Sequence, residues 1–187
     1  MATVGVLVAS GFEQTDMTLL CRGLAEAGHM IRIISTKKHA VRSWDNTRWN
    51  GDLPVDVAVI DADLAGLDGL VLPGGLMSAD TLRADQAAVR LVAAAARQGM
   101  MVAALGHAGW VLIEAGLVRG RYATAHPAIR TDMVNAGGLW RDDPVVTDAL
   151  LITGRHAHDA GAFVAAVLGS LHHQLDPHAG HDRLARG

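Results

Sequence analysis

Hydrophobic and polar positions follow each other along the chain in blocks that predict strands and helices in turn. Short, almost wholly apolar runs at residues 4–9, 30–35, 67–72 and 101–105 are typical of strands buried on both faces of a parallel sheet. Between and after these runs, apolar residues at helical spacing predict helices, the longest over residues 14–27, 86–98 and 159–172. Buried strands separated by helices indicate an α/β protein with a mostly parallel central sheet covered on both faces.

The remaining segments are shorter and less regular. Residues 41–44 and 55–59 are predicted to form short strands, with a turn or hairpin over residues 44–51. Further predicted elements are a helical turn at 79–83, a helix at 128–135, and an antiparallel pair formed by 145–147 and 150–153 around Asp148-Ala149. Residues 173–187 have no apolar period, so we expect a single domain over residues 1–172 followed by a flexible tail.

Composition excludes several classes of function. The net charge of the 187-residue chain is only −3, with no basic excess or basic-aromatic pattern, so no nucleic-acid partner is expected. No apolar run approaches the roughly 20 residues that a membrane helix requires. The N-terminus enters a strand without a leader peptide, and the single cysteine excludes an internal disulfide. We therefore expect a cytoplasmic protein that does not associate with membranes.

The most informative stretch is the turn after the apolar run 101–105. The run passes into Gly106-His107, and a helical pattern begins immediately afterwards. Such a strand–turn–helix unit, called the elbow below, raises one residue above the end of a sheet, next to a helix N-terminus. In enzymes that use this turn the raised residue is a nucleophile, whereas here it is a glycine.

The chain resembles the PfpI/ThiJ intracellular-protease-like family, within the class I glutamine-amidotransferase-like superfamily. The resemblance extends over about residues 3–172 and rests on several motifs in order: Gly11-Phe12-Glu13, Leu72-Pro73-Gly74-Gly75, Asp80 with Leu82-Arg83, residues 106–110, Glu114-Ala115-Gly116 with Arg119-Gly120-Arg121, residues 132–137, and Ile152 to Arg155 with Asp159. It implies a flavodoxin-like three-layer α/β/α sandwich that forms a homodimer or a higher homo-oligomer, with sites near the subunit contacts.

At the elbow, the pattern of this family is Ala-x-Cys-His-Gly-Pro-Trp. The chain retains the histidine as His107 and the tryptophan as Trp110, but Gly106 stands for the nucleophilic cysteine, Ala108 for the glycine and Gly109 for the proline. The resemblance implies that Glu13 lies where an acid sits beside the sulfur, and that Asp80 matches an acid contributed across a subunit contact. Cysteine-dependent peptidase, deglycase or glyoxalase chemistry does not carry over to a glycine.

No other residue replaces the nucleophile. Cys21 lies on the apolar stripe of a predicted helix, and Ser10 and Thr124 lack the turn that exposes a nucleophile. Two interpretations remain. In one, the site has lapsed, glycine relieves backbone strain at the elbow, and the protein is a non-catalytic dimeric binding or stress protein.

In the favoured interpretation the pocket serves a cofactor-free enzyme that acts on a small organic molecule by acid–base catalysis. Glu13 and His107 would transfer protons, and the apolar surroundings of Glu13 would raise its pKa. Lyase, hydratase, isomerase and cyclase reactions are all compatible with this pair, and the divergence of the elbow suggests specialised metabolism. The residues expected to bind or orient the substrate are Gly75, Asp80, Gly106, Trp110, His126 and His156. A third interpretation is weak glyoxalase or deglycase activity through water activated by His107.

No metal or organic cofactor is expected. Two groups of histidines have residue types that could bind a metal ion, but metal binding is not favoured for either. They are the tail group of His172, His173, His178 and His181, and the group of His126, His156 and His158. The glycines at 74–75 lack the longer signature of a phosphate loop, so backbone N–H donors that face the pocket are the better interpretation.

Overall fold

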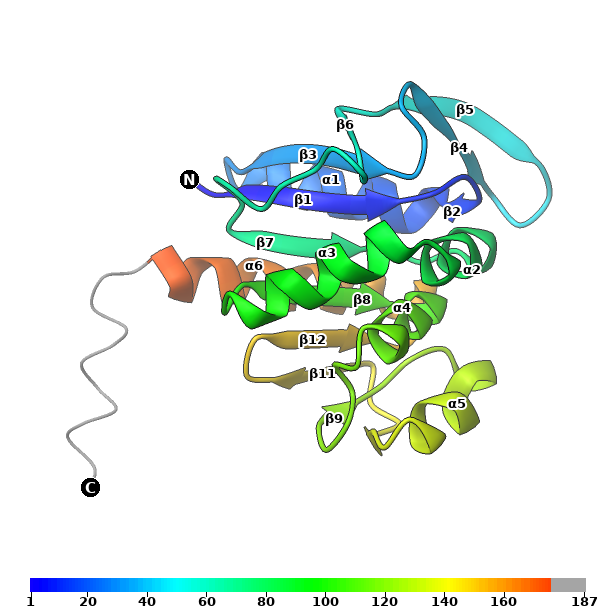
Figure 1. Cartoon of the computed structure of the whole chain (residues 1–187), viewed down its shortest axis with the longest axis vertical. Coiled ribbons are helices and arrows are strands. Elements are labelled where there is room, and N and C mark those ends of the chain that lie inside the picture. Colours follow the sequence, from blue (N-terminus) through cyan, green and yellow to red (C-terminus); the bar gives the residue numbers. More distant parts are fainter. Residues whose placement is uncertain (176–187) are drawn as a thin grey trace.

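The computed structural model describes residues 1–175, and within them the chain is built around a seven-stranded sheet (Figure 1). Its strand order is β11-β12-β8-β7-β1-β3-β6, and all neighbours are parallel except the pair β11–β12. The strands are β1 (Thr3–Val8), β3 (Met30–Ser35), β6 (Val57–Ala58), β7 (Gly69–Leu72), β8 (Met101–Leu105), β11 (Val145–Asp148) and β12 (Leu151–Gly154).

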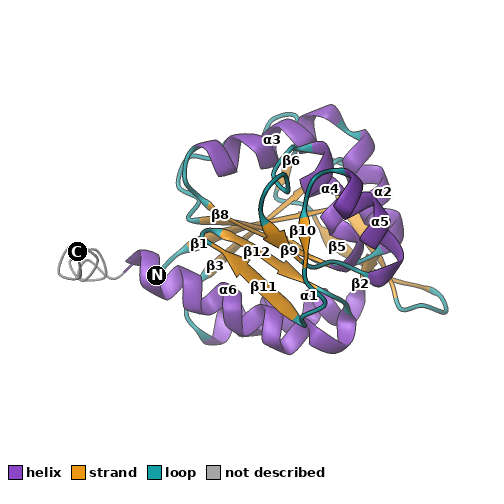
Figure 2. Cartoon of the chain, turned by 90° about the horizontal axis from the view of Figure 1, so that it is seen from below, coloured by secondary structure: helices purple, strands orange, loops and turns teal. Residues whose placement is uncertain are grey.

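Helices cover both faces of this sheet (Figure 2). Helices α1 (Gln14–Glu26) and α6 (Ala160–Leu175) lie on one face, and α2 (Leu76–Ala84), α3 (Gln86–Arg97) and α4 (Gly109–Glu114) lie on the other. A sixth helix, α5 (Arg130–Asn135), follows a single 3₁₀ turn, Pro127–Ile129, and packs on α4. The fold is the expected flavodoxin-like three-layer sandwich with a mostly parallel sheet.

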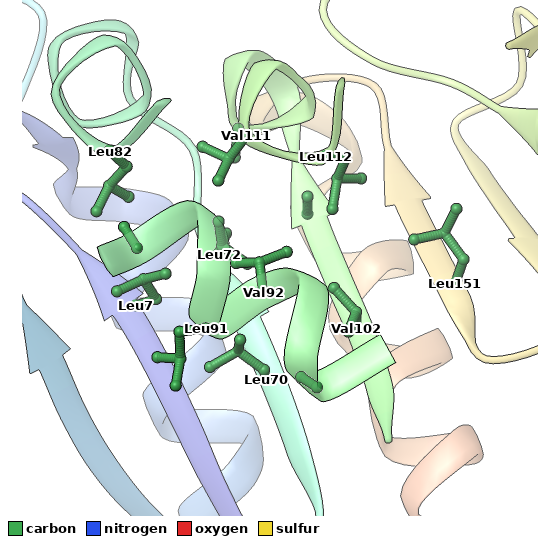
Figure 3. Packing of buried hydrophobic residues seen from close by; sticks show 14 of the residues in the cluster. Leu7, Leu70, Leu72, Leu82, Leu91, Val92, Val102, Val111, Leu112 and Leu151 are labelled. Carbon is green, nitrogen blue, oxygen red and sulfur yellow. The ribbon is translucent and has the colours of Figure 1, made fainter. Parts of the chain in front are cut away.

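Two apolar cores form, one on each face of the sheet, because successive side chains of a strand point to opposite sides. In β7, Leu70 and Leu72 join the core beneath α3 and α4, whereas Val71 joins the core beneath α1 and α6. Figure 3 shows the first core, where Val92 of α3 and Leu112 of α4 pack over the sheet. Burial on both sides explains why these strands are nearly continuous apolar runs.

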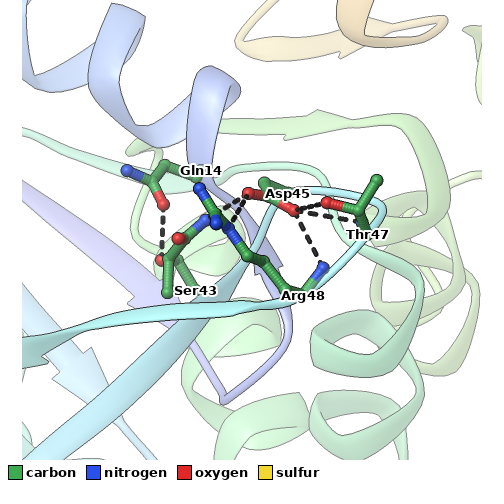
Figure 4. Close-up of polar contacts among 6 residues, drawn as sticks. Gln14, Ser43, Asp45, Thr47 and Arg48 are labelled. Atoms are coloured by element: carbon green, nitrogen blue, oxygen red, sulfur yellow. Dashed lines mark hydrogen bonds and ion pairs between the residues drawn. The ribbon is translucent and has the colours of Figure 1, made fainter.

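A smaller three-stranded sheet stands beside the carboxyl edge of the main one. It contains β2 (Phe12–Glu13), β4 (Ala40–Trp44) and β5 (Trp49–Pro54), in which β4 and β5 form the predicted hairpin. Asp45 holds the hairpin tip, because its carboxylate accepts hydrogen bonds from the Thr47 hydroxyl, the Arg48 N–H and the Asn50 amide (Figure 4). Ser43 ties the hairpin to α1 through a 2.9 Å hydrogen bond to Gln14.

The structure departs from the predicted elements in a few places. Helix α2 begins at Leu76, well before the expected helical turn, because Gly75 at φ +125° lets the chain enter the helix directly. The tip of the β11–β12 hairpin is Ala149-Leu150, one residue later than expected, since Asp148 stays in its strand and accepts a hydrogen bond from the Tyr122 N–H.

The remaining differences concern very short or terminal elements. The predicted strand at 55–59 is reduced to β6, and the pair β9 (Tyr122–Ala123) and β10 (Leu139–Trp140) was not predicted. Helix α6 continues to Leu175 and does not end at residue 172. The rest of the predicted tail, with His178 and His181, lies outside the described residues. No helix in residues 1–175 is both long enough and apolar enough to cross a bilayer.

Candidate active site

The candidate site lies at the carboxyl edge of the sheet, where the chain leaves adjacent strands in opposite directions. After β1 the chain passes through α1 to β3, and after β7 it passes through α2 and α3 to β8, on the other side. Such a divergence opens a crevice at the carboxyl ends of the two strands. The loops after β1, β7 and β8 carry Glu13, Gly75 and Gly106 to this edge.

The elbow after β8 has the geometry predicted from its sequence. Gly106 is buried at φ +62° and starts a 3₁₀ turn, Gly106–Ala108, that leads into α4. A Cβ atom added at Gly106 would have only the carbonyl oxygen of Arg155 near it, at 3.8 Å. The position therefore has room for a side chain, and its backbone conformation, not crowding, favours glycine.

Two imidazole rings stack beside the elbow. The ring centroids of His107 and His126 are 4.1 Å apart, with 22° between the ring planes. The backbone N–H of His126 donates to the Gly106 carbonyl at 3.3 Å. The ring Nδ1 of His126 accepts from the backbone N–H of Ala128 at 3.2 Å. Because Nδ1 is an acceptor, the neutral His126 ring carries its proton on Nε2.

Both rings are neutral at pH 7. Burial, together with the nearby His126, lowers the pKa of His107 to about 4. Burial also lowers the pKa of His126, with a smaller contribution from His156. His156 itself is held on its other side, with its Nδ1 3.1 Å from the Asp159 carboxylate and its ring edge-on to His158.

Two carboxyl groups lie at the start of α1. Glu13 is half-buried, and burial raises its pKa, with a further contribution from Asp45. Asp16 is a candidate site residue that the sequence analysis does not name. Its side chain is buried, with the residue only 3% exposed. Burial and the charge of Glu13 raise the pKa of Asp16 to about 7. Its Oδ1 atom has no hydrogen-bond partner among the described residues.

Gly74 connects the acids to the elbow. A Cβ atom there would collide with the Asp16 carboxylate and would lie 3.8 Å from the carbonyl oxygen of Leu105, the residue before Gly106. The Gly74 carbonyl also accepts from the Glu13 N–H at 2.8 Å. Gly75, proposed as a backbone donor, packs against the backbone of residues 11–13, where a Cβ would approach the Gly11 carbonyl oxygen to 2.5 Å. The Gly-Gly pair thus lets three loops meet closely.

The structure places Asp80 and Trp110 on the outer side of this group. Asp80 is exposed and forms a 2.9 Å ion pair with Arg83, whose guanidinium lies 4.4 Å from the centre of the Trp110 ring. The Trp110 indole N–H donates to Asp132 at 2.7 Å, and the ring centroid is 5.4 Å from that of His107. Trp110 therefore forms a fixed wall beside His107, while Asp80 is turned toward Arg83 within this chain.

In the described part of the chain, no alternative residue is placed to act as the nucleophile in place of the missing cysteine. Cys21 is half-buried on α1, and burial raises the pKa of its thiol, which disfavours the reactive thiolate. Thr124 is fully buried, and the Ser10 hydroxyl accepts a hydrogen bond from the Arg42 N–H. Within residues 1–175, no three His, Cys, Asp or Glu side chains are grouped so that they could hold a metal ion.

A flavodoxin-like sheet with an elbow, an adjacent histidine and acids after its first strand defines a class of α/β proteins with a site at the sheet edge. The chain belongs to the DJ-1/PfpI family, whose pattern matches residues 2–170.

Relatives and solved structures agree. A deglycase of Pyrococcus abyssi is 32% identical over 159 residues, covering 85% of this chain and 93% of the relative. General stress protein 18 of Bacillus subtilis is 32% identical over 161 residues, covering 86% and 92%. A two-domain Anabaena variabilis protein with DJ-1/ThiJ/PfpI-like and ferritin-like domains superposes with a TM-score of 0.86 at 34% identity, covering 92% of this chain and 48% of that protein.

Proposed function

We propose that the protein is a cofactor-free enzyme that transfers protons on a small organic molecule without a covalent intermediate. The observation that carries this proposal is the buried Asp16 carboxyl group of raised pKa, which lies beside Gly74 at the same edge of the sheet as the elbow and its stacked imidazoles. The reaction class that fits is a lyase, hydratase, isomerase or cyclase reaction.

The acid–base roles follow from the order of the pKa values. The pKa of Asp16, about 7, lies above that of His107, about 4. At pH 7 the Asp16 carboxyl is about half protonated, so it takes up and releases protons, which suits a general acid–base group. His107 stays neutral, and a neutral imidazole N–H polarises a carbonyl oxygen without surrendering its proton. The carboxyl pair therefore moves the proton, and His107 stabilises the developing oxyanion.

The same charges select the kind of substrate. Two carboxyl groups disfavour a substrate carboxylate or phosphate next to them, because like charges repel in a poorly solvated site. The neutral His107–His126 stack offers no compensating positive charge. The substrate is therefore a neutral molecule with a polarised carbonyl or similar group, and the exposed Asp80 leaves this edge open to a second copy in the expected homodimer.

Exchange of substrate protons with solvent tests the proposal before the natural substrate is known. A panel of small aldehydes and ketones is incubated with the protein in D₂O, and loss of the signals of protons next to the carbonyl is followed by ¹H NMR. Wild-type protein should accelerate exchange for at least one compound. Asp16→Asn and His107→Ala should each lower that rate by about 100-fold or more.

The matched control is Asp143→Asn, which makes the same chemical change at an exposed loop carboxylate and should keep the full rate. Full exchange in both site variants would refute the proposal. Absence of exchange for the whole panel would favour a non-catalytic binding or stress protein instead. Light scattering on the purified protein checks the homodimer.

Weak deglycase or glyoxalase activity is a second candidate, supported by the relatives named as deglycases. The open space above Gly106 makes it testable, because a cysteine side chain fits there. If the remaining groups can still serve such chemistry, Gly106→Cys should gain methylglyoxal turnover, with Gly106→Ala as the matched control. Absence of methylglyoxal turnover in the wild type would argue against this candidate, and equal rates in the two variants would show that a cysteine at position 106 adds no activity.

A further inference from the structure

A hollow lies at the opposite end of the sheet from Gly106, beside the first residues of β8 and β12. Figure 1 shows where these two strands begin. It has a volume of about 390 Å³ and is bordered by the end of α3, the loop after α4 and the β11–β12 turn. Its apolar floor is formed by Met100, Val102, Leu117, Leu150 and Leu151. No aspartate or glutamate is among its lining residues.

Three arginines border this hollow: Arg97, Arg119 and Arg121. They come from two separate segments, since Arg97 is in the last turn of α3 and the other two follow α4. None of the three forms an ion pair with a carboxylate of residues 1–175. We refer to this site as the arginine hollow.

Hydrogen bonds hold the loop that carries Arg119 and Arg121. The Gly120 N–H donates to the Gly137 carbonyl, and the Leu139 N–H donates to the Arg121 carbonyl, both at 2.8 Å. The Arg121 guanidinium reaches across to the Asp148 carbonyl at 3.3 Å, while the Arg119 side chain lies against Gly137. The proposed acid–base site gives no role to this Arg-Gly-Arg motif.

Negative groups near this end lie outside the hollow itself. Helices α3 and α4 both end here, and each C-terminus contributes roughly half a negative charge. The Asp148 carboxylate accepts from the Tyr122 N–H at 2.9 Å, and Glu114 is exposed in the last turn of α4, but neither residue lines the hollow. The charged side chains that line the hollow are therefore all positive.

We propose that the arginine hollow binds a small organic anion with an apolar body, such as a medium-chain carboxylate. The guanidinium groups would pair with the carboxylate, because their planar N–H donors match its two oxygens. The apolar floor would receive the hydrocarbon part, and the volume of about 390 Å³ lies within the usual range for small-molecule pockets. This ligand differs in charge from the neutral substrate proposed at the elbow.

Calorimetric titration with octanoate tests the inference, and 1-octanol serves as the matched uncharged probe. Octanoate should bind saturably, and the double variant Arg119→Gln/Arg121→Gln should bind it about tenfold more weakly or worse. The control Arg130→Gln, which removes an exposed charge on α5, should keep the wild-type affinity. Circular dichroism confirms that each variant is folded.

Equal octanoate affinity in the double variant and the wild type would overturn the inference, as would the absence of saturable binding or equal binding of octanol. A second readout locates the ligand, because ¹H–¹⁵N NMR shifts should gather at residues 96–102, 116–121 and 149–151. Shifts confined to residues 105–110 would place the anion at the elbow and would also overturn it. Proton exchange at the elbow is measured separately, so the two proposals fail independently.

Discussion

Replacement of Asp16 by asparagine should stabilise the fold at high pH while it abolishes the proposed activity. Burial and the neighbouring Glu13 raise the pKa of Asp16 from 3.8 to about 7. Because the folded protein holds this proton more tightly than the unfolded chain, the contribution of Asp16 to the free energy of unfolding falls as pH rises from about 4 to about 7 and stays low above that range. Above pH 7, ionised Asp16 costs about 4 kcal/mol of stability.

The variant removes this pH-dependent cost. Asparagine has nearly the same shape as a protonated aspartic acid but does not ionise, so the stability difference between the variant and the wild type should grow with pH. From the two pKa values, the difference should increase by about 2–3 kcal/mol between pH 5 and pH 8.5 in favour of Asp16→Asn. A buried group that destabilises the fold where it ionises is typical of a residue kept for function.

Urea unfolding at both pH values, followed by tryptophan fluorescence, measures this difference. The control Asp143→Asn makes the same change at an exposed position and should keep the same stability difference from the wild type at both pH values. If the stability difference between Asp16→Asn and the wild type is the same at pH 5 and pH 8.5, the inferred burial of a protonated acid is wrong.

Three further predictions concern single positions. Ala149→Gly should raise the free energy of unfolding by about 1 kcal/mol in urea, because Ala149 has φ +53°; a loss of stability would contradict this. Gly75→Ala should lower it by about 2–4 kcal/mol, since its Cβ would meet backbone atoms of residues 11–13; Gly51→Ala, in open space, is the control. The His107 ¹⁵N signals should stay those of a neutral ring from pH 8 down to about pH 5; protonation near pH 6.5 would refute the burial.

The sequence predicts those parts of the fold in which many residues share one environment. The strand Met101–Leu105 matches its predicted bounds because all five of its positions are buried. The strand Met30–Ser35 also matches, although only its second half is buried, because its apolar run has the same length as the strand. Strands β9 and β10 contain two residues each, which is too short to show any period, and their pairing depends on the loop after α4. Short elements fixed by tertiary contacts therefore escape prediction from local patterns.

The same contrast holds at the site. The elbow depends on local sequence at the end of β8, so the sequence predicts it. The stacking of His107 on His126 joins two separate segments, and the sequence names both residues as candidates without predicting that the rings meet. Asp16 is not among the predicted site residues, because it belongs to none of the motifs that carry the resemblance. Its spacing contains a signal, since Asp16, Leu20 and Leu24 lie four residues apart on one helix face, and all three are buried. An acid in an apolar row indicates a buried carboxyl group.

The energies of Gly106 and Asp16 bear on whether the site is in use. A side chain at Gly106, at φ +62°, would add strain of about 1–3 kcal/mol, although the space is open. The ionised Asp16 carboxylate costs about 4 kcal/mol above pH 7, which is at least as much. If the site had lost its function and changed only to gain stability, replacement of Asp16 would raise the free energy of unfolding at least as much as glycine at position 106 does. A chain with an unstrained elbow and a costly buried acid is therefore expected of a working acid–base site and not of a relic, and the Asp16→Asn variant tests this expectation.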